Sequence, residues 1–118
     1  MRILCVDDDP DWNVLVSHFL ELSGYEVVCA EGAESALALV EQQPVDLVIT
    51  DLSMPGIDGA KFIETLKQNP RYRNVPVILI TAYHRDTRTE QSLRHGAAFV
   101  LPKPVDLEHL LALVRFAE

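Results

Sequence analysis

Short apolar segments recur along this chain and place the strongest limit on its fold. Most of them lack the alternation of polar and apolar residues that is typical of a strand with one solvent-facing side. Continuous apolar strands of this length indicate a parallel sheet that is covered on both faces. The segments are residues 3–6, 25–30, 45–50, 77–81 and 99–101.

Between these segments the apolar residues change to a helical spacing of about 3.6 residues. The clearest case is the last one, where Leu107, Leu110, Leu111 and Val114 follow the i, i+3, i+4, i+7 pattern. The weakest is the largely polar segment 86–94. Strands and helices that alternate in this way predict an α/β fold, a flavodoxin-like doubly wound (βα)5 with a parallel sheet in strand order 2-1-3-4-5.

The ends of the first expected helix carry residues that favour helix boundaries. Asp9 can accept hydrogen bonds from the first turn, and Pro10 suits the first helical position. Gly24 follows the last apolar residue of the helical pattern and is a typical helix end. Trp12 lies on this helix, and we expect it to pack in the core. A length of 118 residues predicts that residues 1–118 form a single domain.

Charge and composition narrow the classes of function. The net charge of −8 and the absence of a Lys/Arg cluster argue against direct binding of nucleic acid by this segment. No apolar stretch approaches the roughly 18 residues of a membrane span, and no charged-then-apolar leader opens the sequence. We therefore expect a cytoplasmic protein without a membrane contact. Cys5 and Cys29 belong to no metal or CxxC pattern, and we expect two small buried thiols.

Acidic residues follow two strands that the predicted order makes neighbours. Asp7 and Asp8 come directly after the first apolar segment, and Asp51 comes at the end of the third. Ligands of such a sheet bind beyond the carboxyl ends of its strands. Clustered carboxylates repel one another unless a cation or protons intervene, and Mg²⁺ is the natural oxygen-binding cation. The alternative is that Asp8 and Asp9 only cap the first helix and Asp51 only begins a loop.

A hydroxyl and an ammonium group are expected at the same edge of the sheet. Thr81 ends the fourth segment, and Lys103 follows the fifth. Lys103 stands between Pro102 and Pro104, which restrain its backbone as a fixed ligand contact requires. A plain ion pair for the lysine and an ordinary loop position for the threonine remain open for each residue alone. The functional interpretation depends on all of these groups meeting in one place.

Four motifs in this sequence resemble the signature of the response-regulator receiver domains of two-component signalling. They are Val-Asp-Asp at 6–8, Asp-Leu-Ser-Met-Pro-Gly-Ile-Asp-Gly at 51–59, Thr-Ala at 81–82 and Lys-Pro at 103–104. Their order and spacing agree with the family, and the resemblance covers essentially the whole chain. The element at 51–59 is the most specific of the four.

The resemblance implies a role for each acidic residue. Asp51 would accept a phosphoryl group from the phosphohistidine of a histidine kinase or a histidine phosphotransfer protein. Asp7, Asp8 and Asp51 would bind Mg²⁺ together with the main-chain carbonyl of Ser53. Hydrolysis of the acyl phosphate would reset the switch, so that the protein catalyses its own phosphoryl transfer and autodephosphorylation without being an enzyme for another substrate.

The resemblance also implies how the modified site is recognised. Lys103 would pair with one phosphoryl oxygen, Thr81 would donate its hydroxyl to another, and the Lys103-Pro104 peptide would be cis. The signal would reach a downstream output domain or protein through the face of the fourth helix, fifth strand and fifth helix. A phosphorylation-dependent homodimer is a further possibility.

One position departs from the family pattern. The family commonly has Tyr or Phe three residues before its lysine, and here that residue is Val100. Phe99 should point to the opposite face of the sheet, because neighbouring side chains alternate along a strand. Coupled switching of Thr81 with a ring is therefore not expected at Val100. Tyr83 could take part in a substitute switch, contact a partner or be an ordinary loop residue.

Two other functions fit part of the pattern. A phosphatase resembling the haloacid dehalogenase family would use Asp7 as nucleophile together with Asp9. It would leave the 51–59 element unexplained, and 118 residues leave no room for a cap domain. A pseudo-receiver would keep the fold as a binding module with idle acids, but the complete acidic set and Lys103 argue against it. The fold alone does not decide among these functions.

Overall fold

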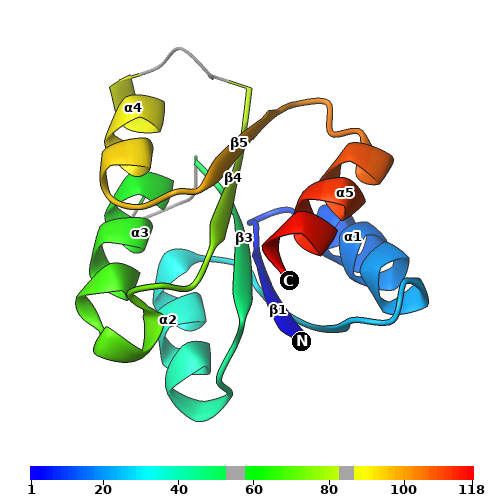
Figure 1. The fold of residues 1–118 in the computed structure, drawn as a ribbon, viewed down its shortest axis with the longest axis horizontal. Coiled ribbons are helices and arrows are strands. Elements are labelled where there is room, and N and C mark those ends of the chain that lie inside the picture. Colours follow the sequence, from blue (N-terminus) through cyan, green and yellow to red (C-terminus); the bar gives the residue numbers. More distant parts are fainter. Residues whose placement is uncertain (53–57, 83–86) are drawn as a thin grey trace.

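A single parallel sheet with helices on both faces organises the chain (Figure 1). The computed structural model describes residues 1–52, 58–82 and 87–118, and for residues 87 and 88 it describes the backbone alone. The strands run in the order β2-β1-β3-β4-β5, as the sequence predicts. Their bounds are β1 Arg2–Val6, β2 Glu26–Ala30, β3 Leu47–Asp51, β4 Val77–Thr81 and β5 Phe99–Pro102.

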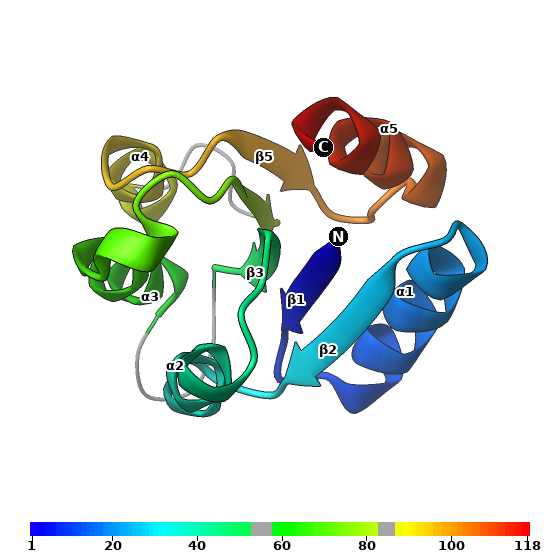
Figure 2. The same cartoon turned by 60° about the horizontal axis from the view of Figure 1, so that its bottom comes forward.

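The helices cover the sheet in two layers (Figure 2). One apolar cluster lies on the side of α1 and α5, and the other lies on the side of α2, α3 and α4. This arrangement confirms the predicted flavodoxin-like fold. The described helices are α1 Pro10–Leu22, α2 Ala33–Gln42, α3 Gly59–Gln68, α4 Thr87–Arg94 and α5 Leu107–Ala117, with a short 3-10 helix at Pro70–Tyr72.

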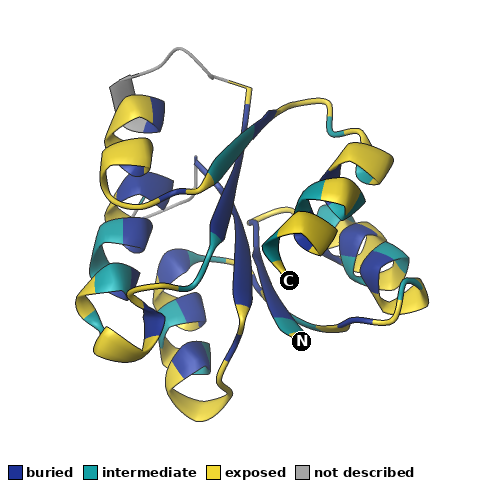
Figure 3. Cartoon of the chain, viewed as in Figure 1, coloured by how far each residue is buried: buried dark blue, intermediate teal, exposed yellow. Residues whose placement is uncertain are grey.

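Burial follows position in the sheet (Figure 3). The three central strands β1, β3 and β4 are almost wholly buried, because helices cover both faces and neighbouring strands cover both edges. The outer strands β2 and β5 are only partly buried. Among the described residues no helix is both long and apolar enough to cross a membrane.

The predicted ends of the first helix are confirmed. Asp9 Oδ1 accepts hydrogen bonds from the backbone N–H groups of Asp11 and Trp12, at 3.0 and 3.4 Å. Pro10 occupies the first helical position, where its missing N–H costs no hydrogen bond. Gly24 follows the helix with a φ of 97°, a left-handed conformation that glycine adopts without a steric penalty.

The prediction of two buried thiols is correct for Cys5 and wrong for Cys29. Cys5 lies on the central strand β1 and is buried, whereas Cys29 is exposed. The reason is that Cys29 lies near the carboxyl end of β2, which is the edge strand of the sheet that the described residues form. An apolar run in the sequence does not reveal whether its strand is central or at the edge.

Candidate functional site at the carboxyl ends of the strands

Three carboxylates meet where β1 and β3 end. Val6 and Thr50 are partners in the parallel register of these strands, so Asp7 and Asp51, which follow them, lie side by side at this edge of the sheet. One carboxylate oxygen from each of Asp7, Asp8 and Asp51 lies within 4.8 Å of the others. Asp7 and Asp51 are buried and Asp8 is exposed. The structure thus brings together the acidic residues that the sequence singled out.

Asp7 has a raised pKa in this cluster. Burial raises its pKa to about 6, and the negative charges of Asp51 and Asp8 act in the same direction. The Asp9 N–H, which donates to Asp7 Oδ1 at 2.9 Å, and the Lys103 ammonium only partly oppose this. A cation or a proton would relieve the repulsion in this cluster.

The alternative was that Asp8 and Asp9 only cap the first helix and that Asp51 only begins a loop. It is correct for Asp9 alone. Asp9 caps α1 through its side chain, as described above, while its backbone N–H donates to Asp7. Asp8 is not the capping residue of α1, and its carboxylate joins the cluster with Asp7 and Asp51. Asp51 is the last residue of β3 rather than part of the following loop.

Lys103 brings a positive charge to the buried Asp51. Its Nζ lies 3.3 Å from Asp51 Oδ2, and the lysine side chain is partly open to solvent. Its backbone N–H donates to the Thr81 carbonyl oxygen at 3.0 Å, which fixes the segment after β5 against the end of β4. The peptide bond between Lys103 and Pro104 is cis, as the family resemblance implies.

Thr81 lies on the strand next to Asp51, at the same edge of the sheet. Asp51 pairs in register with Ile80, and Thr81 is the next residue of β4. Thr81 itself pairs with Pro102, the residue before Lys103. The threonine is buried, so its position is set by the sheet rather than by a loop.

A cavity of about 400 Å³ lies in front of these groups. It has room for a small ion with water and a phosphoryl group. Three carboxylates, with no soft ligand among the described residues of this cavity, suit a hard cation such as Mg²⁺ better than zinc or copper. Trp12 packs partly against the core, as predicted, and also lines this cavity. The lining is completed by Asp7, Asp8, Asp9, Asp51, Lys103, Pro104 and Val105.

Two of the singled-out residues, Ser53 and Tyr83, lie outside the described residues. The predicted metal contact of the Ser53 carbonyl and the role of Tyr83 therefore stay predictions.

Val100, which stands where the family commonly has Tyr or Phe, and its neighbour Phe99 are both among the described residues. Phe99 packs with the cluster on the α1 and α5 side, and its ring lies edge-on to Phe116 with the centroids 5.8 Å apart. Val100 packs against the opposite cluster, which confirms that the two side chains point to opposite faces. Val100 also lines a groove of about 320 Å³ with Thr89, Leu93 and Pro102.

Two residues that support the site had no role in the sequence analysis. Asn13 is buried on α1, and its Nδ2 donates to the Asp7 carbonyl oxygen at 2.9 Å and to that of Ala30 at 3.4 Å. Gly59 begins α3 and its N–H donates to the Leu52 carbonyl oxygen at 2.7 Å. Neither contact leaves a periodic signal in the sequence, although Gly59 stands within the 51–59 element.

Comparison with known proteins agrees with this site. A family model described as the response regulator receiver domain matches residues 3–115. A 14.6 kDa protein of Leptolyngbya boryana is 39% identical over 115 residues, with 98% of this chain and 88% of that protein covered. The response regulator protein FleR of Pseudomonas aeruginosa is 38% identical over 113 residues, which cover 96% of this chain but 24% of FleR. The structure of the chemotaxis response regulator CheY4 of Vibrio cholerae superposes with a TM-score of 0.92 at 29% identity and covers 99% of this chain and 98% of that one.

Proposed function

Because this chain belongs to the response regulator receiver domains, the phosphoacceptor modules of two-component signalling, we propose that Asp51 is its phosphoryl acceptor. The observation that carries this proposal is the contact of Lys103 Nζ with Asp51 Oδ2, 3.3 Å away, beside two further carboxylates. A buried carboxylate beside a fixed cation is placed to attack a phosphorus atom whose oxygens the cation stabilises. The phosphoryl donor is the phosphohistidine of a histidine kinase or a histidine phosphotransfer protein.

The acidic cluster is the proposed site of Mg²⁺. Asp7, Asp8 and Asp51 would hold the ion with the main-chain carbonyl of Ser53. When bound, the ion supplies positive charge that offsets the charge of the phosphoryl oxygens. The carboxylates would fix its position, and Asn13 holds the backbone of Asp7 in place through the Asp7 carbonyl oxygen. Support comes from the short separation of the three carboxylates and the raised pKa of Asp7.

Lys103 and Thr81 are the proposed recognition groups of the modified state. Lys103 Nζ would pair with one phosphoryl oxygen, and the Thr81 hydroxyl would donate to another. Phosphorylation adds about 1.5 to 2 negative charges, which both groups are placed to meet. The domain is a signalling module rather than an enzyme for a separate substrate. We propose that it catalyses its own phosphoryl transfer and that water hydrolyses the acyl phosphate to reset it.

The output surface is proposed on α4, β5 and α5. Two large apolar side chains on these helices are exposed, Leu93 on α4 and Phe116 on α5. They support contact with a downstream domain or protein, or with a second copy of the chain in a phosphorylation-dependent homodimer. The net charge of −8 supports a protein partner rather than nucleic acid for this segment. A single domain over residues 1–118 and a cytoplasmic location stay predictions from the sequence.

The phosphatase alternative places the nucleophile at Asp7. Asp7 Oδ1 accepts the Asp9 N–H, and burial raises the pKa of Asp7 to about 6, so part of the Asp7 population is protonated near neutral pH. Asp51 is the acid in contact with the Lys103 ammonium. These differences favour attack by Asp51. The same contacts argue against a pseudo-receiver with idle acids.

Acetyl phosphate, a small phosphoryl donor, tests the proposed function without the cognate kinase. We expect intact-mass spectra to show one phosphoryl adduct that forms with Mg²⁺ and is absent in EDTA. Peptide mapping of the adduct should assign it to Asp51. An adduct on Asp7 would favour the phosphatase alternative, and a protein that takes up no phosphoryl group would be a pseudo-receiver.

Binding of Mg²⁺ should depend on pH through Asp7. The pKa of Asp7 is raised to about 6, so below that pH the ion must displace a proton. We expect the affinity to fall about tenfold between pH 7 and pH 5, as for one proton with this pKa. Quenching of the fluorescence of Trp12, the single tryptophan and a residue of the site cavity, provides the titration signal. An affinity that stays constant over this range would contradict the role of Asp7 as a ligand.

Replacing Lys103 with glutamine should slow phosphorylation of Asp51. The change removes the ammonium 3.3 Å from Asp51 Oδ2, and the loss of one such charge-stabilising group costs roughly 100-fold in rate. The rate is measured by the growth of the phosphoryl adduct in Mg²⁺ and acetyl phosphate. Lys61→Gln is the matched control, because Lys61 is an exposed residue of α3 whose ion-pair partner is Glu64. Equal rates in the two variants would exclude a role for Lys103 in the transfer.

A further inference from the structure

Cys5 and Cys29 face each other across β1 and β2. They are partners in the parallel register of these strands, so their side chains leave the same face of the sheet. Neighbouring strands lie about 4.8 Å apart, which is within the range of roughly 4.4 to 6.8 Å between the Cα atoms of a disulfide. The two thiols are free in the structure. Their backbone positions therefore suit a disulfide without a change of fold.

The two thiols influence each other's ionisation. The Cys29 thiol donates to the Asn13 carbonyl oxygen at 3.8 Å. The neighbouring Cys5 thiol lowers the pKa of Cys29 to about 7, and Ser17 acts in the same direction. Partial burial and the charge of Glu21 on α1 oppose this shift. Cys29 thus has a larger thiolate fraction at neutral pH than an ordinary cysteine.

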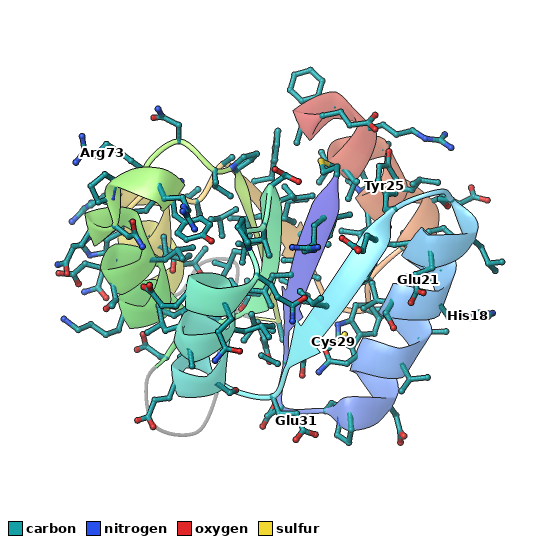
Figure 4. The ribbon with its side chains drawn as sticks, turned by 90° about the horizontal axis from the view of Figure 1, so that it is seen from below. His18, Glu21, Tyr25, Cys29, Glu31 and Arg73 are labelled. Atoms are coloured by element: carbon teal, nitrogen blue, oxygen red, sulfur yellow. The ribbon has the colours of Figure 1, made fainter. Side chains whose placement is uncertain are left out.

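The two cysteines differ in access to solvent. Cys5 is 1% exposed, whereas Cys29 is exposed on the edge strand and lines a cavity of about 480 Å³ with residues that include Asn13, Glu31 and Ser35. Figure 4 shows Cys29 on β2 beside α1, which carries His18 and Glu21. This cavity is distinct from the one lined by the acidic cluster. A small oxidant can reach Cys29 from solvent, and Cys5 lies behind it.

We propose that Cys29 and Cys5 form a peroxide-reactive dithiol site, in which Cys29 is oxidised first and Cys5 closes an intramolecular disulfide across β1 and β2. The Cys29 thiolate attacks one oxygen of the peroxide, the O–O bond breaks, and the departing hydroxide takes a proton to become water. Cys29 is then a sulfenic acid. The Cys5 thiol attacks its sulfur and loses its proton, the S–O bond breaks, and a second water leaves as the S–S bond forms. Two thiols lose two electrons, and the peroxide is reduced to two waters.

Hydrogen peroxide tests this site on the unmodified protein. We expect the two titratable thiols per chain to fall to none, with a monomer mass lower by two hydrogens and a Cys5–Cys29 cross-linked peptide under non-reducing conditions. Dithiothreitol should restore both thiols. The proposal is overturned if both thiols remain under conditions that oxidise free glutathione in a separate control sample. It is also overturned by a covalent dimer joined through Cys29, or by sulfinic acid at Cys29 with Cys5 still free.

Two variants test the order of the steps. In Cys5→Ala, which removes a buried thiol with little change of volume, Cys29 should stop at a sulfenic acid that dimedone traps. In Cys29→Ser, the buried Cys5 should keep its thiol under the same treatment. Rapid loss of the Cys5 thiol in Cys29→Ser would show that Cys29 is not the attacking group. Circular dichroism of each variant establishes that the fold is retained, and the measurement on the unmodified protein does not depend on either variant.

Discussion

With Asp51 replaced by asparagine, the protein should form no phosphoryl adduct with acetyl phosphate and Mg²⁺. The amide that replaces the carboxylate has the same shape but is a far weaker nucleophile and a poorer Mg²⁺ ligand. Intact-mass spectra should show a fall of at least about 100-fold in adduct. The loss should not reflect unfolding, because the substitution removes one of three mutually repelling carboxylates. We therefore expect a melting temperature close to that of the parent protein in the absence of metal.

A matched acidic residue outside the cluster provides the control for this prediction. Asp11 is exposed in the first turn of α1, and Asp11→Asn should be phosphorylated like the parent. An adduct that survives in Asp51→Asn would refute Asp51 as the acceptor. Its position would then discriminate further, because an adduct on Asp7 is the result that the phosphatase alternative requires. The Asp51 substitution should also lower the pKa of Asp7, since the negative charge of Asp51 is one of the causes that raise it.

The parts of the fold that local patterns determine were predictable from the sequence. Buried parallel strands need continuous apolar segments, and amphipathic helices need apolar residues at intervals of about 3.6, so their alternation indicated the layers and the class of fold. The carboxyl ends of parallel strands share one edge, so the gathering of Asp7, Asp8 and Asp51 followed from the strand order. The helical assignment of the polar segment before Arg94 was also correct, because α4 spans Thr87–Arg94.

Features that depend on tertiary contacts were not predictable in this way. Cys29 lies in an apolar run like that of Cys5, but only the position of β2 at the sheet edge leaves it exposed. The support of the Asp7 backbone by Asn13 crosses from α1 to the end of β1, and one asparagine on a helix carries no sign of such a contact. The raised pKa of Asp7 likewise results from burial and neighbouring charges that only the folded chain brings together.

The lack of a ring at Val100 concerns how the domain responds to phosphorylation and not the chemistry of the site. The carboxylates, Lys103 and Thr81 are placed by the ends of the strands, and nothing in that placement depends on a ring at residue 100. The neighbouring Phe99 cannot substitute, because it packs on the opposite face of the sheet against Phe116. Phosphoryl transfer should therefore proceed without a ring at this position, and any response of the α4, β5 and α5 face must use other groups.

Replacing Gly59 with alanine should destabilise the protein and disturb Asp51. A Cβ atom at Gly59 would lie 2.5 Å from the Asp51 carbonyl oxygen and 2.8 Å from the Leu52 Cα, both backbone atoms that cannot move without displacing the end of β3. Overpacking of this kind costs about 1–3 kcal/mol in the free energy of unfolding. Urea denaturation should show a lower midpoint with an unchanged slope. Phosphorylation by acetyl phosphate should also slow, because the displaced backbone carries Asp51, the proposed acceptor.

Gly32→Ala is the matched control for this substitution. Gly32 precedes α2 as Gly59 begins α3, but no atom lies within 4 Å of a Cβ built there, and its φ of −165° is accessible to any residue. We expect its urea midpoint and phosphorylation rate to stay close to those of the parent. If Gly59→Ala were as stable and as active as Gly32→Ala, the close approach of α3 to the end of β3 would not position Asp51. If stability fell while the phosphorylation rate of the folded fraction stayed the same, the contact would hold α3 to the sheet without setting the geometry of the acceptor.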